Sequence, residues 1–297
     1  MNKKVFALIA AVSLTAALAA CGSDPAETAP AVSAPAQTEQ TQPTTAPASF
    51  EEIILREDEN CTVKITAIEE DGLWGYTLKA YLENKTDKEL MFSVSNASVN
   101  GFMCDPFWAV TVSAGMKANE EIHFAEEDLK RSSIETVTDI EFTLRVYDNN
   151  DWDTGDLVDE AVAIYPLGEE AVQPFTRQSV ADEIVLFDDN NCTMIVTGFD
   201  PDNIWGYTMN VYLENKTDKK LMFSIGDAAV NGFMCDPFWA ETVAPGKRSN
   251  TTVSWMQQDF EENGIAEVET LTLPIRVYNA DNWNENDLVN ETFTINP

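Results

Sequence analysis

The chain contains the same sequence twice, and this duplication constrains its fold more than any other feature. The segment VNGFMCDPFWA at 99–109 returns unchanged at 230–240, and AYLENKTDK at 80–88 returns with only its first residue changed. The offset is 131 positions throughout (192 − 61 for the first cysteines, 283 − 152 for the last tryptophans). No gap is needed from residue 50 to the C-terminus.

A copy of about 117 residues has the size of a domain rather than of a solenoid repeat. We therefore predict two domains, at 50–166 and 181–297, joined by a connector at 167–180. We expect both domains to have the same fold.

Each copy has the apolar pattern of an all-β fold. Residues 63–68 and 76–82 alternate between apolar and polar side chains or form short apolar runs, and clusters of Asp, Asn and Gly separate such segments. Asn100-Gly101 between apolar runs is a strong hairpin signal. Only Glu126–Ser133 favours a helical turn. Seven or eight short strands per copy predict two tandem Ig-like antiparallel β-sandwiches.

The first 49 residues have the composition of an export signal followed by a tether. A basic start and an apolar run lead to Leu18-Ala19-Ala20-Cys21, which resembles the lipobox of bacterial lipoproteins. We predict a signal peptide at 1–20 and an acyl lipid such as palmitate on Cys21, which would anchor an extracytoplasmic chain to the cell membrane. The alternative is an ordinary signal whose apolar run ends at a cysteine. Residues 21–49 are rich in Ala, Pro, Thr and Gln and predict a disordered tether.

The charge of the chain excludes one class of partner. It carries 51 acidic and 18 basic residues, a formal net charge of -33. This sign repels nucleic acids and anionic lipid headgroups, which attract basic proteins. We expect no nucleic-acid partner, and most of the acidity to form a solvated surface.

The five cysteines divide into one at the predicted lipidation site and one pair in each copy. Cys61 with Cys104, and Cys192 with Cys235, predict one disulfide per domain outside the cytoplasm. The alternative is two buried free thiols per copy. Zinc is disfavoured because two cysteines without a neighbouring histidine supply too few ligands.

The aromatic residues offer two sets of candidate binding residues. Six of the seven tryptophans are repeat partners, and we expect packing to account for most of them. Trp152 and Trp283 lie in polar loops and are the best candidates to stack on a sugar ring. A patch shared by both copies is the second candidate, and its residues are Phe107, Trp108, Phe238 and Trp239.

The sequence gives no positive sign of catalysis. His123 is the only histidine, and Ser254 takes its place in copy 2, so a histidine-based catalytic group cannot be common to both copies. The acidic loop at 148–156 does not follow the spacing of an EF-hand and favours a solvated loop over a calcium site. We predict no catalytic residues, metal site or cofactor.

At Tyr81–Lys88 followed by Asn100–Ala109, the chain resembles small Ig-like domains of Gram-positive bacterial lipoproteins, similar to the DUF4352 group. The resemblance covers both copies and implies an extracytoplasmic Ig-like fold, with no established activity or site residues. The sequence as a whole predicts a non-enzymatic binding or interaction module of the cell envelope, whose partner is a protein or an envelope glycan. A carbohydrate-binding module and a structural spacer are the alternatives, and an enzyme is a distant one.

Overall fold

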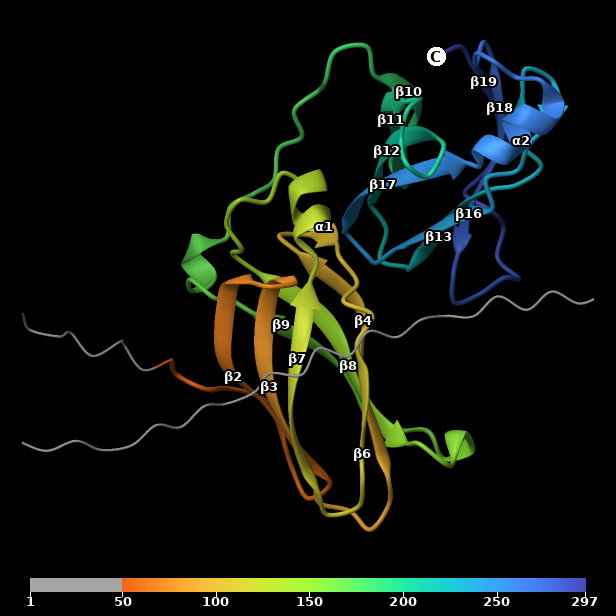
Figure 1. The fold of residues 1–297 in the computed structure, drawn as a ribbon. Coiled ribbons are helices and arrows are strands. Elements are labelled where there is room, and N and C mark those ends of the chain that lie inside the picture. Colours follow the sequence, from red (N-terminus) through yellow and green to blue (C-terminus); the bar gives the residue numbers. More distant parts are fainter. Residues whose placement is uncertain (1–49) are drawn as a thin grey trace, which may run out of the picture. The chain divides into compact units, whose positions relative to one another are not determined.

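The computed structural model describes residues 50–297, and their regular structure consists mainly of β-strands with a few short helical turns (Figure 1). The predicted signal peptide, the lipidated Cys21 and the tether lie outside the described residues. No helix within the described range is long and apolar enough to cross a membrane. The prediction of an all-β fold is confirmed.

Copy 1 forms two antiparallel sheets. The first has the strand order β1-β2-β3-β7, and the second is centred on β4, which pairs with β8 on one edge and with β5 and β6 on the other, while β9 extends the sheet from β8. The strands are β1 (Ile53–Glu57), β2 (Cys61–Gly72), β3 (Gly75–Asn84), β4 (Leu90–Val99), β5 (Phe102–Met103), β6 (Ala109–Val112), β7 (Lys117–Phe124), β8 (Ile140–Asp148) and β9 (Asp156–Ile164).

Copy 2 repeats this topology, with one difference in its second sheet. The strand that corresponds to β4 is broken into β13 and β14, which both pair with β18. The first sheet has the order β10-β11-β12-β17, and β17 joins it to the second sheet of copy 1 by a parallel pairing of Arg248 with Phe102 of β5, so that the two form one nine-stranded sheet. The strands are β10 (Ile184–Asp188), β11 (Cys192–Asp200), β12 (Tyr207–Asn215), β13 (Leu221–Ile225), β14 (Ala229–Val230), β15 (Phe233–Met234), β16 (Trp239–Val243), β17 (Arg248–Trp255), β18 (Leu271–Asn279) and β19 (Val289–Ile295).

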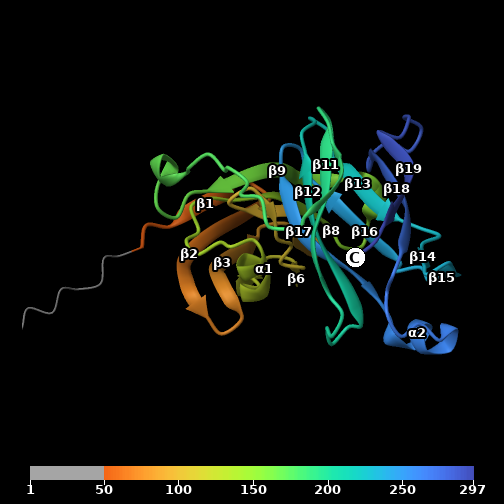
Figure 2. The same cartoon turned by 90° about the horizontal axis from the view of Figure 1, so that it is seen from above.

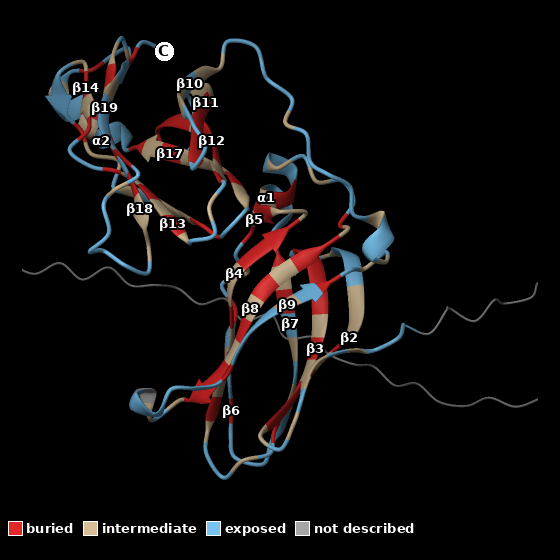
Figure 3. Cartoon of the chain, turned by 180° about the vertical axis from the view of Figure 1, so that it is seen from behind, coloured by how far each residue is buried: buried red, intermediate tan, exposed pale blue. Residues whose placement is uncertain are grey.

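The core of each copy is built from the alternate residues of both its sheets. Leu78 and Leu82 of β3 pack in one cluster with Leu90 and Phe92 of β4, and the equivalent strands of copy 2 contribute a second cluster. Buried and half-buried residues alternate along β8, as Figure 3 shows. Each fully buried Leu or Phe contributes about 1.5–3 kcal/mol. The two-residue period read from the sequence is therefore the period of the core.

Helices are short and occupy the same place in both copies. Within the described residues the α-helices are α1 (Glu126–Arg131), which follows β7, and α2 (Gln257–Asn263), which follows β17. Leu129 of α1 and Phe260 of α2 are buried against the core below. The helical turn expected at Glu126–Ser133 is confirmed. Two 3-10 turns complete the chain, η1 (Trp152–Thr154) and η2 (Glu169–Ala171).

The Asn-Gly hairpin is present, and its asparagine does more than turn the chain. Asn100 and Gly101 both have positive φ values, 49° and 77°, as a type I′ turn requires, and Val99 pairs with Phe102. The Asn100 side chain also accepts a hydrogen bond from Thr138 N (2.8 Å) and donates one to Thr136 O (2.8 Å). It thereby fixes the hairpin to the segment between α1 and β8.

The repeated Asn-Lys-Thr-Asp-Lys sequence is a structural brace rather than a recognition motif. Asn84 is buried and ends β3. Its Nδ2 donates to Lys88 O (2.7 Å) and to Val112 O (2.8 Å), and its Oδ1 accepts from Thr86 N (2.9 Å) and Thr86 Oγ1 (2.8 Å). Asn215 makes the equivalent bonds in copy 2. One amide therefore closes the loop between the two sheets, which accounts for its retention in both copies.

All four cysteines of the described chain are free and buried, contrary to the predicted disulfides. In copy 2, Cys192 pairs with Asn215 at one end of the sheet. The Cys235 carbonyl instead accepts a hydrogen bond from Trp255 Nε1 (2.9 Å), at the far end of β17. A strand of eight residues is about 23 Å long, whereas a disulfide requires Cα atoms about 4.4–6.8 Å apart.

Copy 1 places its cysteines in the same way. Cys61 pairs with Asn84 at one end of β2, whereas the charges of Asp128 and Arg131 in α1 act on the pKa of Cys104 at the other end. Burial raises the pKa of Cys61 to about 11 and that of Cys104 to about 12. An even number of cysteines per domain does not show whether their Cα atoms are close enough for a disulfide. These thiols are core residues that stay protonated at neutral pH.

Candidate functional site

The single histidine lies beside a threonine hydroxyl and a carboxylate, Glu121, whose Oε2 is 3.4 Å from His123 Nε2. His123 Nδ1 lies 3.0 Å from Thr77 Oγ1, on the neighbouring strand of the first sheet. In copy 2 the hydroxyls of Ser254 and Thr208 make the same contact, also at 3.0 Å. A serine therefore fills the position of the histidine. Across residues 50–297, no group of three His, Cys, Asp or Glu side chains is placed to hold a metal ion.

The turn between the first two long strands of each copy carries two exposed apolar residues. Leu73 and Trp74 lie between β2 and β3, and Trp74 is 68% exposed. Ile204 and Trp205 occupy the same turn in copy 2, where Trp205 is 73% exposed. Packing was expected to account for these tryptophans, and the structure corrects that expectation. The missed signal is a pair of large apolar residues inside a turn that ends in glycine.

A glycine holds each of these turns against the end of the sandwich. Gly75 has φ of 110°, and a Cβ built on it would stand 2.2 Å from Phe124 O. Gly206 has φ of 96°, and its Cβ would stand 2.1 Å from Trp255 O. Figures 1 and 2 show the β2–β3 turn beside α1. The backbone of the turn is therefore in direct contact with the end of β7 or β17, and the exposed side chains project from a fixed base.

The repeated Asp-Pro-Phe-Trp segment places its two aromatic residues in opposite environments. Phe107 and Phe238 are 93% and 91% exposed, whereas Trp108 is buried and Trp239 is half-buried and packs on its core. Of the four residues predicted as a shared patch, the two phenylalanines belong to the surface. The two tryptophans belong to the packing below it.

Both phenylalanines are held in a conformation that is unfavourable for a side chain. Their φ values are 47° and 49°, in the left-handed region, which costs roughly 1 kcal/mol or more per residue. Asp105 Oδ1 accepts from Phe107 N (2.8 Å), and Asp236 Oδ1 accepts from Phe238 N (2.9 Å), so the preceding aspartate stabilises the turn. The same strained geometry occurs in both copies.

The two exposed features lie at the same end of each sandwich. Cys235, three residues before Phe238, is hydrogen-bonded through its carbonyl to Trp255, whose own carbonyl is in contact with Gly206. We call this end the tip surface. It consists of Leu73, Trp74 and Phe107 in copy 1 and of Ile204, Trp205 and Phe238 in copy 2.

Acidic residues surround the tip surface. Glu69, Glu70 and Asp71 precede the turn in copy 1, and the first turn of α1 is Glu126-Glu127-Asp128. The two basic residues of α1 are already paired, Lys130 with Glu126 (2.6 Å) and Arg131 with Asp128 (2.8 Å). In copy 2, α2 carries acidic residues and no Lys or Arg. The tip surface is therefore apolar at its centre and negative around it.

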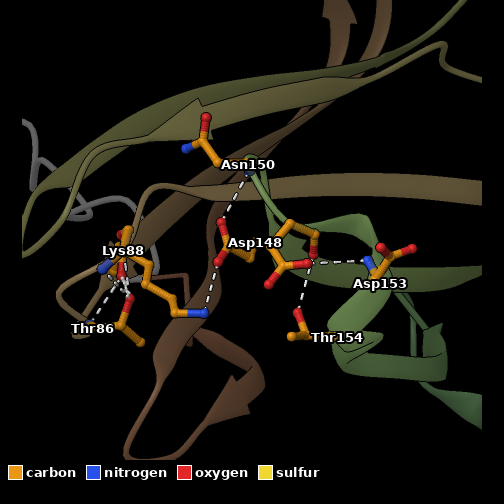
Figure 4. A network of polar contacts seen from close by, with 8 residues as sticks. Thr86, Lys88, Asp148, Asn150, Asp153 and Thr154 are labelled. Atoms are coloured by element: carbon orange, nitrogen blue, oxygen red, sulfur yellow. Dashed lines mark hydrogen bonds and ion pairs between the residues drawn. The ribbon is translucent and has the colours of Figure 1, made fainter.

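The opposite end of copy 1 is a polar loop whose acidic residues are engaged within the chain (Figure 4). Asp148 accepts hydrogen bonds from Lys88 Nζ (2.8 Å) and Asn150 N (3.0 Å), and the Lys88 bond is the largest cause that lowers the pKa of Asp148. Asp156 forms an ion pair with Arg145 (2.8 Å). Two of the four aspartates of the loop at 148–156, Asp148 and Asp156, are therefore paired with basic side chains. The side chain of Trp152 lies outside the described residues.

The corresponding loop of copy 2 exposes its tryptophan. Trp283 is 82% exposed, and its ring centroid lies 6.5 Å from that of Tyr278. This loop follows β18 and is fixed by ion pairs of Asp287 with Arg276 (2.9 Å) and of Glu285 with Lys219 (2.6 Å). Trp283 is therefore the predicted sugar-stacking residue that the structure places on the surface.

Comparison with known proteins adds little to this geometry. No protein-family model and no curated protein sequence matches the chain. Among solved structures, the chain is similar to the exo-chitosanase CsxA of Amycolatopsis orientalis, with 12% identity and a TM-score of 0.23. The match covers 77% of this chain but only 26% of the chitosanase, and a TM-score this low supports no argument about fold or activity.

Proposed function

We propose that this protein is a membrane-anchored, extracytoplasmic binding module without catalytic activity, and that each copy binds a partner through its tip surface. The observation that carries the proposal is the repeated exposure of Trp74 with Phe107 and of Trp205 with Phe238. Scattered exposed apolar residues are common in soluble proteins, but large exposed apolar residues at the same end of both copies, on a glycine-held turn and at a residue of positive φ, are not.

The charge around the tip surface indicates the chemistry of its partner. An apolar centre within an acidic rim fits a protein surface on which basic and apolar side chains lie together. Two linked copies on one chain raise the effective concentration of the second site once the first is occupied. The N-terminal lipid would hold both sites at the membrane.

The experiment compares the capture of envelope proteins by the full chain and by two matched variants. In the first, Trp74→Ser and Trp205→Ser remove the indoles of the tip surface. In the second, Trp283→Ser removes an equally exposed indole elsewhere. A partner of the tip surface is recovered by the wild type and by the Trp283 variant, and its affinity falls about 30-fold or more in the first variant, as for a binding hot spot. Equal recovery by all three proteins would refute the proposal.

A second function is favoured by the exposure of Trp283. A flat indole on a polar loop is the arrangement expected of a carbohydrate-binding module, because the apolar face of a sugar ring stacks on an aromatic ring. Binding of a saccharide that quenches or shifts the fluorescence of Trp283 would support it. A structural spacer is the outcome in which neither surface has a partner.

A further inference from the structure

Copy 2 contains a pocket at the end of its sandwich opposite to the tip surface. Its walls come from the turn after β10, from the loop 216–219 and from the loop 279–288, and its volume is about 410 Å³. Leu288 contributes apolar surface to the lining, and Leu221 is fully buried beneath it. All the residues that line the pocket belong to copy 2, so it is complete within one domain.

Three exposed asparagine side chains line this pocket and have no hydrogen-bond partner within the described chain, so they are open to a ligand. The amides of Asn190, Asn191 and Asn286 form no side-chain hydrogen bond among residues 50–297, although other asparagines in these loops do, such as Asn282 to Glu285 Oε1 (3.1 Å). Each free amide offers two donors and one acceptor. A concave surface with several free amides is suited to a ligand that carries many hydroxyl groups.

The charges of the pocket are balanced within it. Lys216 donates to Asp188 Oδ1 (2.5 Å) and to Asp189 O (2.7 Å), and Lys219 forms an ion pair with Glu285 (2.6 Å). The two lysines of the lining are matched by its two acidic residues, Asp218 and Glu285. The balance favours a neutral ligand.

The equivalent loops of copy 1 differ from those of copy 2 in most of these amide residues. At the offset of 131, Asn190 corresponds to Glu59, Asn279 to Asp148, and Asn286 to Gly155. Lys88 there contacts Asp148 directly (2.8 Å), as Figure 4 shows. Of the three free amides, copy 1 keeps only the equivalent of Asn191, which is Asn60, while the apolar residues Leu90 and Leu157 remain. The amide pocket is therefore a property of copy 2, separate from the shared fold.

We propose that the amide pocket of copy 2 binds a neutral saccharide, and that Trp283, which lies on the same loop outside the pocket lining, stacks on a sugar ring that extends beyond the pocket. The proposal rests on the carbohydrate-binding function stated above and gives it a site, a ligand class and one copy. Asn190, Asn191 and Asn286 supply the hydrogen bonds, Glu285 supplies a fixed acceptor, and Leu288 contacts the apolar face of the ring. The tip surface takes no part.

The test is a titration of the full chain with neutral tetrasaccharides, namely cellotetraose, maltotetraose and tetra-N-acetylchitotetraose, followed by NMR of the asparagine side-chain amides and by tryptophan fluorescence. We expect one of them to shift the amide signals of Asn190, Asn191 and Asn286. The variant Asn190→Glu with Asn286→Gly reproduces copy 1 and should weaken binding about 10- to 30-fold, as two lost hydrogen bonds predict. Glu59→Gln in copy 1 is the matched control and should leave the affinity unchanged.

Three results would overturn the proposal. The first is that none of these saccharides shifts the amide signals at 10 mM, roughly the weakest affinity of interest. The second is that Asn190→Glu with Asn286→Gly binds with unchanged affinity, and the third is that an acidic oligosaccharide binds more tightly than every neutral one. The variant Trp74→Ser with Trp205→Ser separates this proposal from the tip surface. It should keep saccharide binding while it loses the protein partner. Loss of both activities together would contradict the separation of the two sites.

Discussion

The buried asparagine that closes the loop between the two sheets of each copy should stabilise the fold, and the structure gives the magnitude of its contribution to the free energy of unfolding. In Asn215→Ala, the bonds from Nδ2 to Lys219 O (2.7 Å) and Val243 O (2.9 Å) are lost, together with those that Oδ1 accepts from Thr217 N (2.9 Å) and Thr217 Oγ1 (2.8 Å). Asn215 is fully buried, and so is its partner Val243, whereas Thr217 and Lys219 are closer to the surface. Four bonds at about 1 kcal/mol each give a loss of about 4 kcal/mol in the free energy of unfolding.

The assay is urea denaturation of the full chain, monitored by tryptophan fluorescence. With an m-value of about 2 kcal/mol/M, the transition of copy 2 should move to lower urea by about 2 M in Asn215→Ala. Asn215→Asp keeps the acceptors and loses the donors, so it should cause roughly half the loss. The exposed Asn290, which bonds Asp287 at the surface, is the control, and Asn290→Ala should change stability by less than about 0.5 kcal/mol. A loss below about 1 kcal/mol in Asn215→Ala would show that the brace is not what holds this loop.

Four further predictions follow from features described above. Gly206→Ala should destabilise copy 2 by about 3 kcal/mol or more, because its Cβ would meet Trp255 O and its φ is positive; unchanged thermal unfolding would refute the close contact. The four domain thiols should resist a thiol reagent until the protein unfolds, and reductant should leave the unfolding temperature unchanged; a drop on reduction would reveal a disulfide. Cys21→Ala should abolish lipid labelling and release the protein from membranes, and retention of the label would place the lipid elsewhere. Lys88 lowers the pKa of Asp148, so this contribution to stability is complete above the ordinary carboxyl pKa and is lost as the pH falls through the lowered value; in urea titrations at several pH values, the stability difference from Asp148→Asn should vanish in acid.

The sequence predicted the fold well because the fold depends on local and periodic signals. Alternating apolar residues such as Leu78 and Leu82 can be buried only on one face of a strand, and Asn100-Gly101 fits a type I′ turn that few other pairs allow. The short helix at α1 was also predicted, because Glu126–Ser133 breaks the two-residue period. These signals are carried by neighbouring residues, so they can be read without the tertiary structure.

The candidate site was predicted less well because exposure depends on residues far away in the sequence. Phe107 and Trp108 are adjacent and both aromatic, yet Phe107 is exposed and Trp108 is buried. The positive φ of Phe107 turns the chain between them. The distance between Cys61 and Cys104 likewise depends on strand direction and register, neither of which a count of cysteines contains. Trp74 was missed because its turn is fixed by a contact between Gly75 and Phe124 that only the folded sheet brings about.

That contact has a kinetic consequence for any partner of the tip surface. Because Gly75 and Gly206 fix their turns against the ends of β7 and β17, Trp74 and Trp205 are presented on backbone that is already ordered in the free protein. Binding then requires little loop ordering and no slow rearrangement before contact. Association should proceed at the rate of an ordinary collision between rigid surfaces, and differences in affinity among partners should lie in how long each complex persists.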